Sequence, residues 1–233
     1  MSGEKSVRLN KYISETGVCS RRDADKWIEA GRVTLNGAPA QLGHRVAECD
    51  EVRIDGELIG PKKRAIYIAL NKPVGITCTT EPQVEGNIIA FVGHAQRIFP
   101  VGRLDKDSEG LILLTNDGDI VNEILRSENE HEKEYIVSVN RPITELSLGM
   151  LASGVKIMGV KTKPCKVVRI DPHTFRMILT QGLNRQIRRM CSALGYRVQR
   201  LKRVRIIDID LGSLRTGEWR YLSEPEVAGL LRR

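Results

Sequence analysis

The first 60 residues show two kinds of hydrophobic periodicity. Apolar residues within 9–13 and again within 24–28 recur with the three- and four-residue spacing of an amphipathic helix. Residues 33–35 alternate apolar and polar as in a strand and lead into the hairpin signal Asn36-Gly37, and a strand pattern returns at 52–54. The pattern predicts a small α/β module of two short helices and a small sheet.

Longer patterns occupy the rest of the chain. A polar segment that contains a proline, residues 61–64, is expected to link the leading module, residues 1–60, to a second domain, residues 65–233. Continuous apolar runs at 66–70 and 111–114 predict buried strands, and strand and helix patterns alternate from there to the C-terminus. Many strands joined by hairpins and a few helices favour an α+β fold, in which a mainly antiparallel mixed sheet is flanked by helices.

Composition limits the classes of protein. Hydrophobic residues make up 41% of the chain, enough for a folded core, and no run of about 18 apolar residues is present to cross a membrane. The five cysteines are scattered without a CxxC pair, which is typical of reduced thiols and disfavours disulfides or a zinc site. No Gly-rich phosphate loop and no signal peptide are visible. We therefore expect a cytoplasmic protein that uses no metal and no cofactor.

Positive charge is concentrated in one part of the chain. The sequence has 37 Lys and Arg against 29 Asp and Glu, a formal net charge of +8. Residues 180–207 contain no acidic residue, and we interpret this stretch as a groove that follows the phosphates of a nucleic acid rather than as a merely solvated face. Its eight basic residues are Arg185, Arg188, Arg189, Arg197, Arg200, Lys202, Arg203 and Arg205.

A pair of aspartates is the strongest candidate for chemistry. Asp105 and Asp107 stand two residues apart just before the apolar run at 111–114. Such a pair can bind a metal, act as nucleophile and base, cap the next element, or simply form a charged turn. Arg103 and Lys106 favour the ionised form of a neighbouring carboxylate, and an ionised carboxylate beside a buried strand is costly unless it is paired. These features favour a functional site over a surface turn.

Four segments resemble the motifs of RNA pseudouridine synthases and occur in that family's order. They are Leu70–Gly75 (LNKPVG), Gly102–Leu111 (GRLDKDSEGL), Lys133–Tyr135 (KEY) and Gly182–Met190 (GLNRQIRRM). The leading module resembles the S4-like RNA-binding domain carried by the branch of the family that acts on bacterial ribosomal RNA. The resemblance extends over nearly the whole chain.

The resemblance implies roles for individual residues. Asp105 matches the nucleophile, Tyr135 the tyrosine that stacks on the target uracil and helps to remove its C5 proton, and Arg188 the basic residue that pairs with the nucleophile. Arg103 matches a residue that fills the space left when the target base flips out of the RNA helix. Whether Asp105 attacks uracil C6 or ribose C1′ stays open. Further RNA contacts are expected at Arg8, Lys11, Arg21, Arg22, Asn184, Arg185 and Arg189.

The implied substrate is a specific uridine in large-subunit (23S) ribosomal RNA, with an anticodon-loop uridine of a transfer RNA as the alternative. Two other classes remain open. The Asp105-x-Asp107 pattern also occurs in magnesium-dependent phosphatases and phosphotransferases that use an aspartate nucleophile, and a non-catalytic RNA-binding factor of ribosome assembly would carry similar charge. We expect a monomer.

Overall fold

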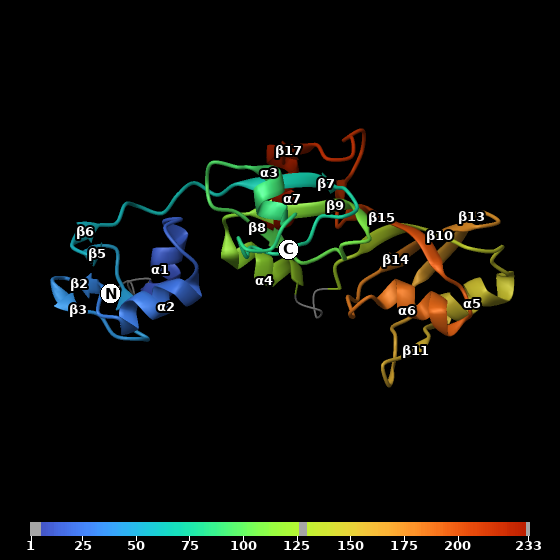
Figure 1. The fold of residues 1–233 in the computed structure, drawn as a ribbon, viewed down its shortest axis with the longest axis horizontal. Coiled ribbons are helices and arrows are strands. Elements are labelled where there is room, and N and C mark those ends of the chain that lie inside the picture. The colour runs from blue at the N-terminus through green and yellow to red at the C-terminus, as the bar shows by residue number, and fades with distance from the viewer. Residues whose placement is uncertain (1–5, 126–129, 232–233) are drawn as a thin grey trace. The chain divides into compact units, whose positions relative to one another are not determined.

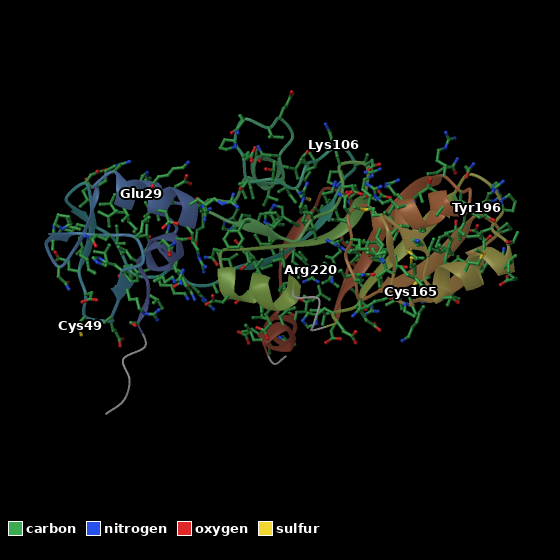
Figure 2. The ribbon with its side chains drawn as sticks, turned by 90° about the horizontal axis from the view of Figure 1, so that it is seen from below. Glu29, Cys49, Lys106, Cys165, Tyr196 and Arg220 are labelled. Atoms are coloured by element: carbon green, nitrogen blue, oxygen red, sulfur yellow. The ribbon has the colours of Figure 1, made fainter. Side chains whose placement is uncertain are left out.

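The computed structural model describes residues 6–125 and 130–231. The chain forms two compact units (Figure 1): Met1–Ala65 with Ala95–Arg97, and Ile66–His94 with Ile98–Arg233. None of the described helices has the length and apolar character needed to cross a membrane. The five cysteines are all free thiols; Figure 2 labels Cys49 in the first unit and Cys165 in the second.

The first unit has the two helices and the small sheet that its periodicity predicts. Helix α1 (Leu9–Glu15) packs against α2 (Arg21–Glu29), and both bury their apolar faces in one core with Val33 and Val52. Ser20 caps α2, because its hydroxyl oxygen accepts a hydrogen bond from the Asp23 amide at 3.1 Å. The strands are β1 (Val7–Arg8) paired with β4 (Arg45–Val46), and the four-stranded sheet β3 (Ala38–Pro39), β2 (Val33–Leu35), β5 (Val52–Ile54) and β6 (Glu57–Leu58).

The second unit is built on a nine-stranded sheet, in the order β13-β14-β10-β15-β9-β7-β17, with β16 paired to β15 and β8 to β9. Among the described strand pairs of this sheet, only β9 with β15 is parallel, which confirms the predicted mainly antiparallel mixed sheet. The strands are β7 (Tyr67–Lys72), β8 (Phe99–Val101), β9 (Glu109–Thr115), β10 (Lys133–Val139), β13 (Lys166–Asp171), β14 (Thr174–Leu179), β15 (Val198–Ile206), β16 (Ile209–Asp210) and β17 (Trp219–Tyr221).

Helices pack on both faces of β9 and explain why its residues 111–114 are apolar throughout. Leu111 and Leu113 of β9 share a core with residues of α4 and α7, whereas Ile112 and Leu114 point to the other face and pack with α3. Helices α5 and α6 lie along strands β10 and β14 (Figure 1), where they bury Phe175 and its neighbours. The helices are α3 (Ile88–Val92), α4 (Gly118–Leu125), α5 (Glu145–Ser153), α6 (Gln186–Ala193) and α7 (Glu224–Leu231), and a hairpin of β11 (Lys156–Ile157) and β12 (Val160–Lys161) follows α5.

A close backbone approach fixes the parallel pair. Gly110 of β9 lies opposite Arg203 of β15 and has φ of +101°. A Cβ placed on Gly110 would come within 2.2 Å of the carbonyl oxygen of Arg203. Both the positive φ and the missing side chain are therefore required at this position.

Replacing Gly110 with alanine should destabilise the second unit, because the new methyl group meets backbone that cannot move without separating β9 from β15. We expect the free energy of unfolding to fall by at least about 2 kcal/mol, measured by urea denaturation followed by circular dichroism. Gly149→Ala in α5 is the matched control. A Cβ there meets nothing within 4 Å, and alanine should stabilise the helix by up to about 1 kcal/mol. Equal effects of the two substitutions would contradict this account.

Candidate active site

A pocket of about 690 Å³ in the second unit brings together most of the residues that the motifs single out. Its lining comes from the loop between β8 and β9, from strands β10 and β15, and from the segment that leads into α6. The structure places in it, of the predicted site residues, Arg103, Asp105, Tyr135, Asn184 and Arg185. Three motifs that are distant in sequence therefore meet at one cavity.

Asp105 lies in a loop that the buried side chain of Leu104 attaches to the core. Leu104 is buried in the core beside β7 and β9, whereas Arg103 and Lys106 on either side are exposed; Figure 2 labels Lys106. The carbonyl oxygen of Asp105 accepts a hydrogen bond from the Ser108 amide at 3.0 Å, which closes a turn. Alternation of buried and accessible side chains thus turns the Asp105 carboxylate toward the pocket, where its side chain is 30% exposed.

The Leu70–Gly75 motif supports this loop. The amide of Gly75 donates to the Lys106 carbonyl oxygen at 2.7 Å. Lys72 is fully buried, and its ammonium group donates to the carbonyl oxygens of Pro73 at 2.9 Å and Ile76 at 2.8 Å. Burial lowers the pKa of Lys72. The motif therefore supports the Asp105 loop through main-chain hydrogen bonds, and its lysine donates to main-chain oxygens within the motif's own segment.

Two arginines and two aspartates form a cluster, of which Asp105 and Arg185 line the pocket. Arg185 binds Asp107 through two hydrogen bonds of 3.0 and 2.9 Å, and its Nη1 lies 3.3 Å from Oδ2 of Asp105. Arg188 donates to the Asp107 carbonyl oxygen at 2.8 Å and to the Ser108 hydroxyl at 3.1 Å. The hydrogen bonds from Arg185, and then the charge of Arg188, hold the pKa of Asp107 below its usual range.

The structure differs from the prediction at Arg188, which was expected to pair with Asp105. The guanidinium within ion-pair distance of Asp105 belongs to Arg185, and Arg188 instead contacts the Asp107 carboxylate at 3.4 Å and the backbone of the loop. The reason is that Arg188 is also tied to the Val198 carbonyl oxygen at 3.3 Å, which draws it beneath the loop. Arg185, at the start of α6, is more exposed and reaches both carboxylates.

The backbone at the start of α6 is unusual. Arg185 occupies the N-cap position with φ of +50° and ψ of +35°, a left-handed conformation that costs a residue with a Cβ on the order of 1 kcal/mol. The buried side chain of Gln186 accepts a hydrogen bond from the Leu183 amide at 3.0 Å and stabilises the turn. Arg189 donates to the carbonyl and side-chain oxygens of Asn184, at 3.0 and 3.1 Å, and so holds that residue beside the pocket.

Two pocket residues, Lys133 and Arg203, were not predicted to belong to the site: Lys133 appeared only within a motif, and Arg203 only among the residues of the basic stretch. Tyr135 lies opposite Arg203 across β10 and β15, with a register shift between Glu134 and Tyr135. Arg203 is only 4% exposed, and its Nε donates to the Leu111 carbonyl oxygen at 2.7 Å. The alternation of side chains along a strand could have identified Arg203 as buried, because Arg203 lies two residues after Leu201, on the same face of β15, and Leu201 is a core residue.

The basic stretch is not the continuous phosphate groove that its composition indicates. Arg205 pairs with Glu132 at 2.8 Å and with Glu134 at 3.0 Å, and Arg200 pairs with Glu109. These carboxylates lie on or next to the strands on either side of β15, far from it in sequence. Part of the positive charge is therefore balanced within the sheet, whereas Arg185, Arg189, Arg197 and Arg200 have exposed side chains.

The predicted contacts of the leading module lie in the first unit. Arg8 directly precedes α1, Lys11 lies within that helix 3.7 Å from Glu15, and Arg21 and Arg22 begin α2. Arg8, Arg21 and Arg22 are exposed.

Comparison with known proteins agrees with this architecture. Residues 66–193 match the family described as RNA pseudouridylate synthase, and residues 7–52 match the S4 domain. The chain is 53% identical to the dual-specificity RNA pseudouridine synthase RluF of Escherichia coli, over 100% of this chain and 81% of that protein. The chain belongs to the RNA pseudouridine synthase family.

A second relative and a solved structure extend the comparison. The ribosomal large subunit pseudouridine synthase B of Bacillus subtilis is 34% identical, over 96% of this chain and 95% of that protein. A crystal structure of a pseudouridylate synthase superimposes with a TM-score of 0.69 at 32% identity, covering 97% of this chain and all of the other. The chain is thus an isomerase with an S4 domain, and membership of this family argues against the phosphatase and the non-catalytic alternatives.

In the described part of the synthase, no group of three or more His, Cys, Asp and Glu side chains is arranged to hold a metal ion. Both carboxylates of the Asp105-x-Asp107 pattern are directed at guanidinium groups. The pattern that resembles a magnesium-binding pair is, in this fold, part of an arginine–carboxylate cluster.

Asp107 stabilises the folded synthase only while it is ionised. Because its pKa is lowered on folding, its contribution is complete above the usual value of about 3.8 and is lost as the pH falls through the lower folded-state pKa. Asp107→Asn should therefore melt below the wild type at neutral pH, and the difference should shrink below about pH 4. Thermal unfolding of both proteins across this range provides the measurement. A difference that stays constant with pH would contradict the ion-pair assignment.

Proposed function

We propose that the synthase converts a specific uridine of large-subunit (23S) ribosomal RNA to pseudouridine in the bacterial cytoplasm, with Asp105 as the nucleophile. The observation that carries the proposal is the position of Asp105, accessible in the pocket, next to Arg185 and in a cavity shared with Tyr135. The assignment to ribosomal RNA rests on the names of the relatives, one of which is a synthase of the ribosomal large subunit.

The reaction requires an enclosed site and a nucleophile that forms a covalent bond to the substrate. Uridine becomes pseudouridine when the bond between C1′ and N1 breaks, the base turns, and C1′ joins C5. A base inside a helix is out of reach, so the nucleotide must flip into the pocket at a cost of a few kcal/mol. A carboxylate that bonds to the substrate holds the intermediate while the base turns, and we assign this role to Asp105.

The arginine cluster supplies orientation. In our proposal Arg185 aims the Asp105 carboxylate, and Asp107 and Arg188 position Arg185 and the loop. Tyr135 offers an aromatic face for the base and a hydroxyl for the C5 proton. Arg103 is exposed at the edge of the pocket, where a side chain can enter the gap left in the RNA helix.

Transfer RNA is a second candidate substrate. The RluF relative is described as a dual-specificity RNA pseudouridine synthase, and we interpret dual specificity as action on two RNA substrates. We propose an anticodon-loop uridine as the second target, because its bases are accessible without the opening of a long helix. Transcripts of a transfer RNA and of large-subunit ribosomal RNA, assayed side by side, distinguish one substrate class from two.

Asp105→Asn should abolish the reaction and leave RNA binding largely intact. Isomerisation replaces the C5–H bond, so tritium release from C5-labelled uridine in large-subunit transcripts measures it directly. We expect the rate to fall by at least about 10³-fold, while the dissociation constant for the transcript changes by less than about threefold. Asp210→Asn, an exposed carboxylate on β16 outside the pocket, is the control and should retain full activity. Release by the Asp105 variant at the wild-type rate would refute the nucleophile assignment.

The leading module should contribute affinity rather than chemistry. Arg21→Gln combined with Arg22→Gln removes two exposed positive charges at the start of α2. We expect weaker RNA binding and a salt dependence of log Kd reduced by roughly one to two units, with an unchanged rate in single turnovers at saturating enzyme. Arg53→Gln, whose guanidinium is occupied by Glu51, is the control in the same module. If the double variant binds RNA as the wild type does at every salt concentration, these residues make no phosphate contacts.

A further inference from the structure

Arg203 is a buried cation with an unsatisfied donor. Its side chain is 4% exposed, Nε is occupied by the Leu111 carbonyl oxygen, and Nη2 is buried without a hydrogen-bond partner. None of the described Asp or Glu side chains forms an ion pair with it. Burying a charge and a donor without partners is costly, and such groups concentrate at functional sites where a ligand completes them.

The fold holds Arg203 in this costly position. Its backbone packs against Gly110, and it lies directly across from Tyr135 on β10. The register shift beside Tyr135 is of the kind that re-aims side chains next to active sites. Opposed residues of an antiparallel pair share a face of the sheet, so Arg203 and Tyr135 stand side by side in the lining of the pocket.

A second cation is close to Arg203. Lys133 lines the same pocket, and its ammonium group donates to the His131 carbonyl oxygen at 3.1 Å. Burial, and then the charge of Arg203, lower the pKa of Lys133. The wall on this side of the pocket is therefore electropositive, whereas Asp105 supplies negative charge to the lining.

We propose that Arg203 is a further catalytic residue, whose guanidinium group donates to a carbonyl oxygen of the flipped uracil and stabilises the negative charge that forms on the base when its glycosidic bond breaks. This inference rests on the proposed function. A preorganised donor aimed at developing charge in a site without water is among the strongest devices available to an enzyme.

The electron count of the step shows where such a donor is needed. If Asp105 attacks C1′, its oxygen forms a bond to C1′ while the C1′–N1 bond breaks, and the electron pair of that bond passes to the uracil, where it spreads over N1 and the carbonyl oxygens. After the base turns, C5 bonds to C1′ and the Asp105 carboxylate leaves. C5 then loses its proton and N1 gains one, so the net charge is unchanged. The base is anionic only between bond cleavage and reattachment, which is when Arg203 would act.

The test combines an enzyme variant with a substrate variant. Single-turnover rates are measured for the wild type and for Arg203→Met on transcripts whose target uridine, once mapped with the wild type, is replaced by 2-thiouridine or by 4-thiouridine. Sulfur accepts hydrogen bonds poorly, and the cycle of four rates cancels the intrinsic effect of sulfur on the leaving group. Arg176→Met is the matched control, because it also removes an arginine side chain from the sheet. Arg176 lies on β14 opposite Ile136, the residue after Tyr135 on β10, and it does not line the pocket.

We expect Arg203→Met to slow the reaction at least tenfold with an RNA dissociation constant within threefold of the wild type. For one of the two thio substitutions, the ratio of the oxo rate to the thio rate should be at least fivefold larger in the wild type than in Arg203→Met. The substituted atom that gives this difference is the oxygen that Arg203 contacts. Arg176→Met should behave as the wild type. Arg203→Lys keeps the charge and should regain part of the rate, which provides a second variant if the methionine protein does not fold.

Identical ratios of thio to oxo rates in wild type and variant, for both oxygens, would overturn the proposal even if Arg203→Met were slow, since a purely structural role would not distinguish the atoms. An unchanged rate in Arg203→Met would overturn it as well. Failure of the wild type to form pseudouridine in either ribosomal or transfer RNA would overturn the proposed function and this inference together, and is thereby distinguishable from a failure of Arg203 alone.

Discussion

The parallel contact between β9 and β15 is the constraint on which the site depends. Asp105 precedes β9, and the segment into α6 precedes β15, so these two regions meet only if the strands that follow them lie side by side. At Gly110 the backbones come so close that no side chain fits between them. The glycine of the Gly102–Leu111 motif is thus as much a part of the site as its aspartate, although it touches nothing in the pocket.

Charge balance is the second theme of the site. Two guanidinium groups and two carboxylates form one cluster, of which Asp105 and Arg185 line the pocket, and each of the four has a partner of opposite sign. Lys133 and Arg203 also line the pocket, and neither forms an ion pair with any of the described carboxylates. The difference separates what the protein satisfies internally from what it leaves for the substrate, and RNA brings both phosphates and polar base edges.

Local sequence patterns were sufficient for several of the elements and for the family, whereas α3, α5 and the hairpin of β11 and β12 were not predicted. The spacing of Ala24, Trp27 and Ile28 predicts α2, and the apolar run at 111–114 predicts a strand that proves to be covered on both faces. The ordered motifs led to the family and to the pocket loop. In each case the physical cause is short-range, namely periodicity, a cap or a turn.

The ion-pair partners of the charged residues could not be predicted from the sequence. Arg200 and Arg205 look unpaired along the chain, yet Glu109, Glu132 and Glu134 meet them through strand pairing between residues about 70 to 90 positions apart. The contact of Arg185, rather than Arg188, with Asp105 likewise depends on distant residues, since Arg188 donates to the Val198 carbonyl oxygen. Sequence reasoning identifies which groups carry charge, whereas only the register of the sheet shows which of them are left without a counter-charge.

The left-handed residue at the start of α6 has a geometric consequence. A helix turns by 100° for each residue, so Arg185 and Arg188, three positions apart, leave the helix on nearly the same side. Because the reversal of φ at Arg185 stops the helix from growing toward its N-terminus, the rotational phase of α6 relative to the aspartate loop is set at its first turn. A change of one residue in that spacing would swing Arg188 by 100° away from the loop while leaving the helix, its composition and its charge intact. Relatives that keep this arrangement are therefore constrained in the length of the segment, and not only in its residues.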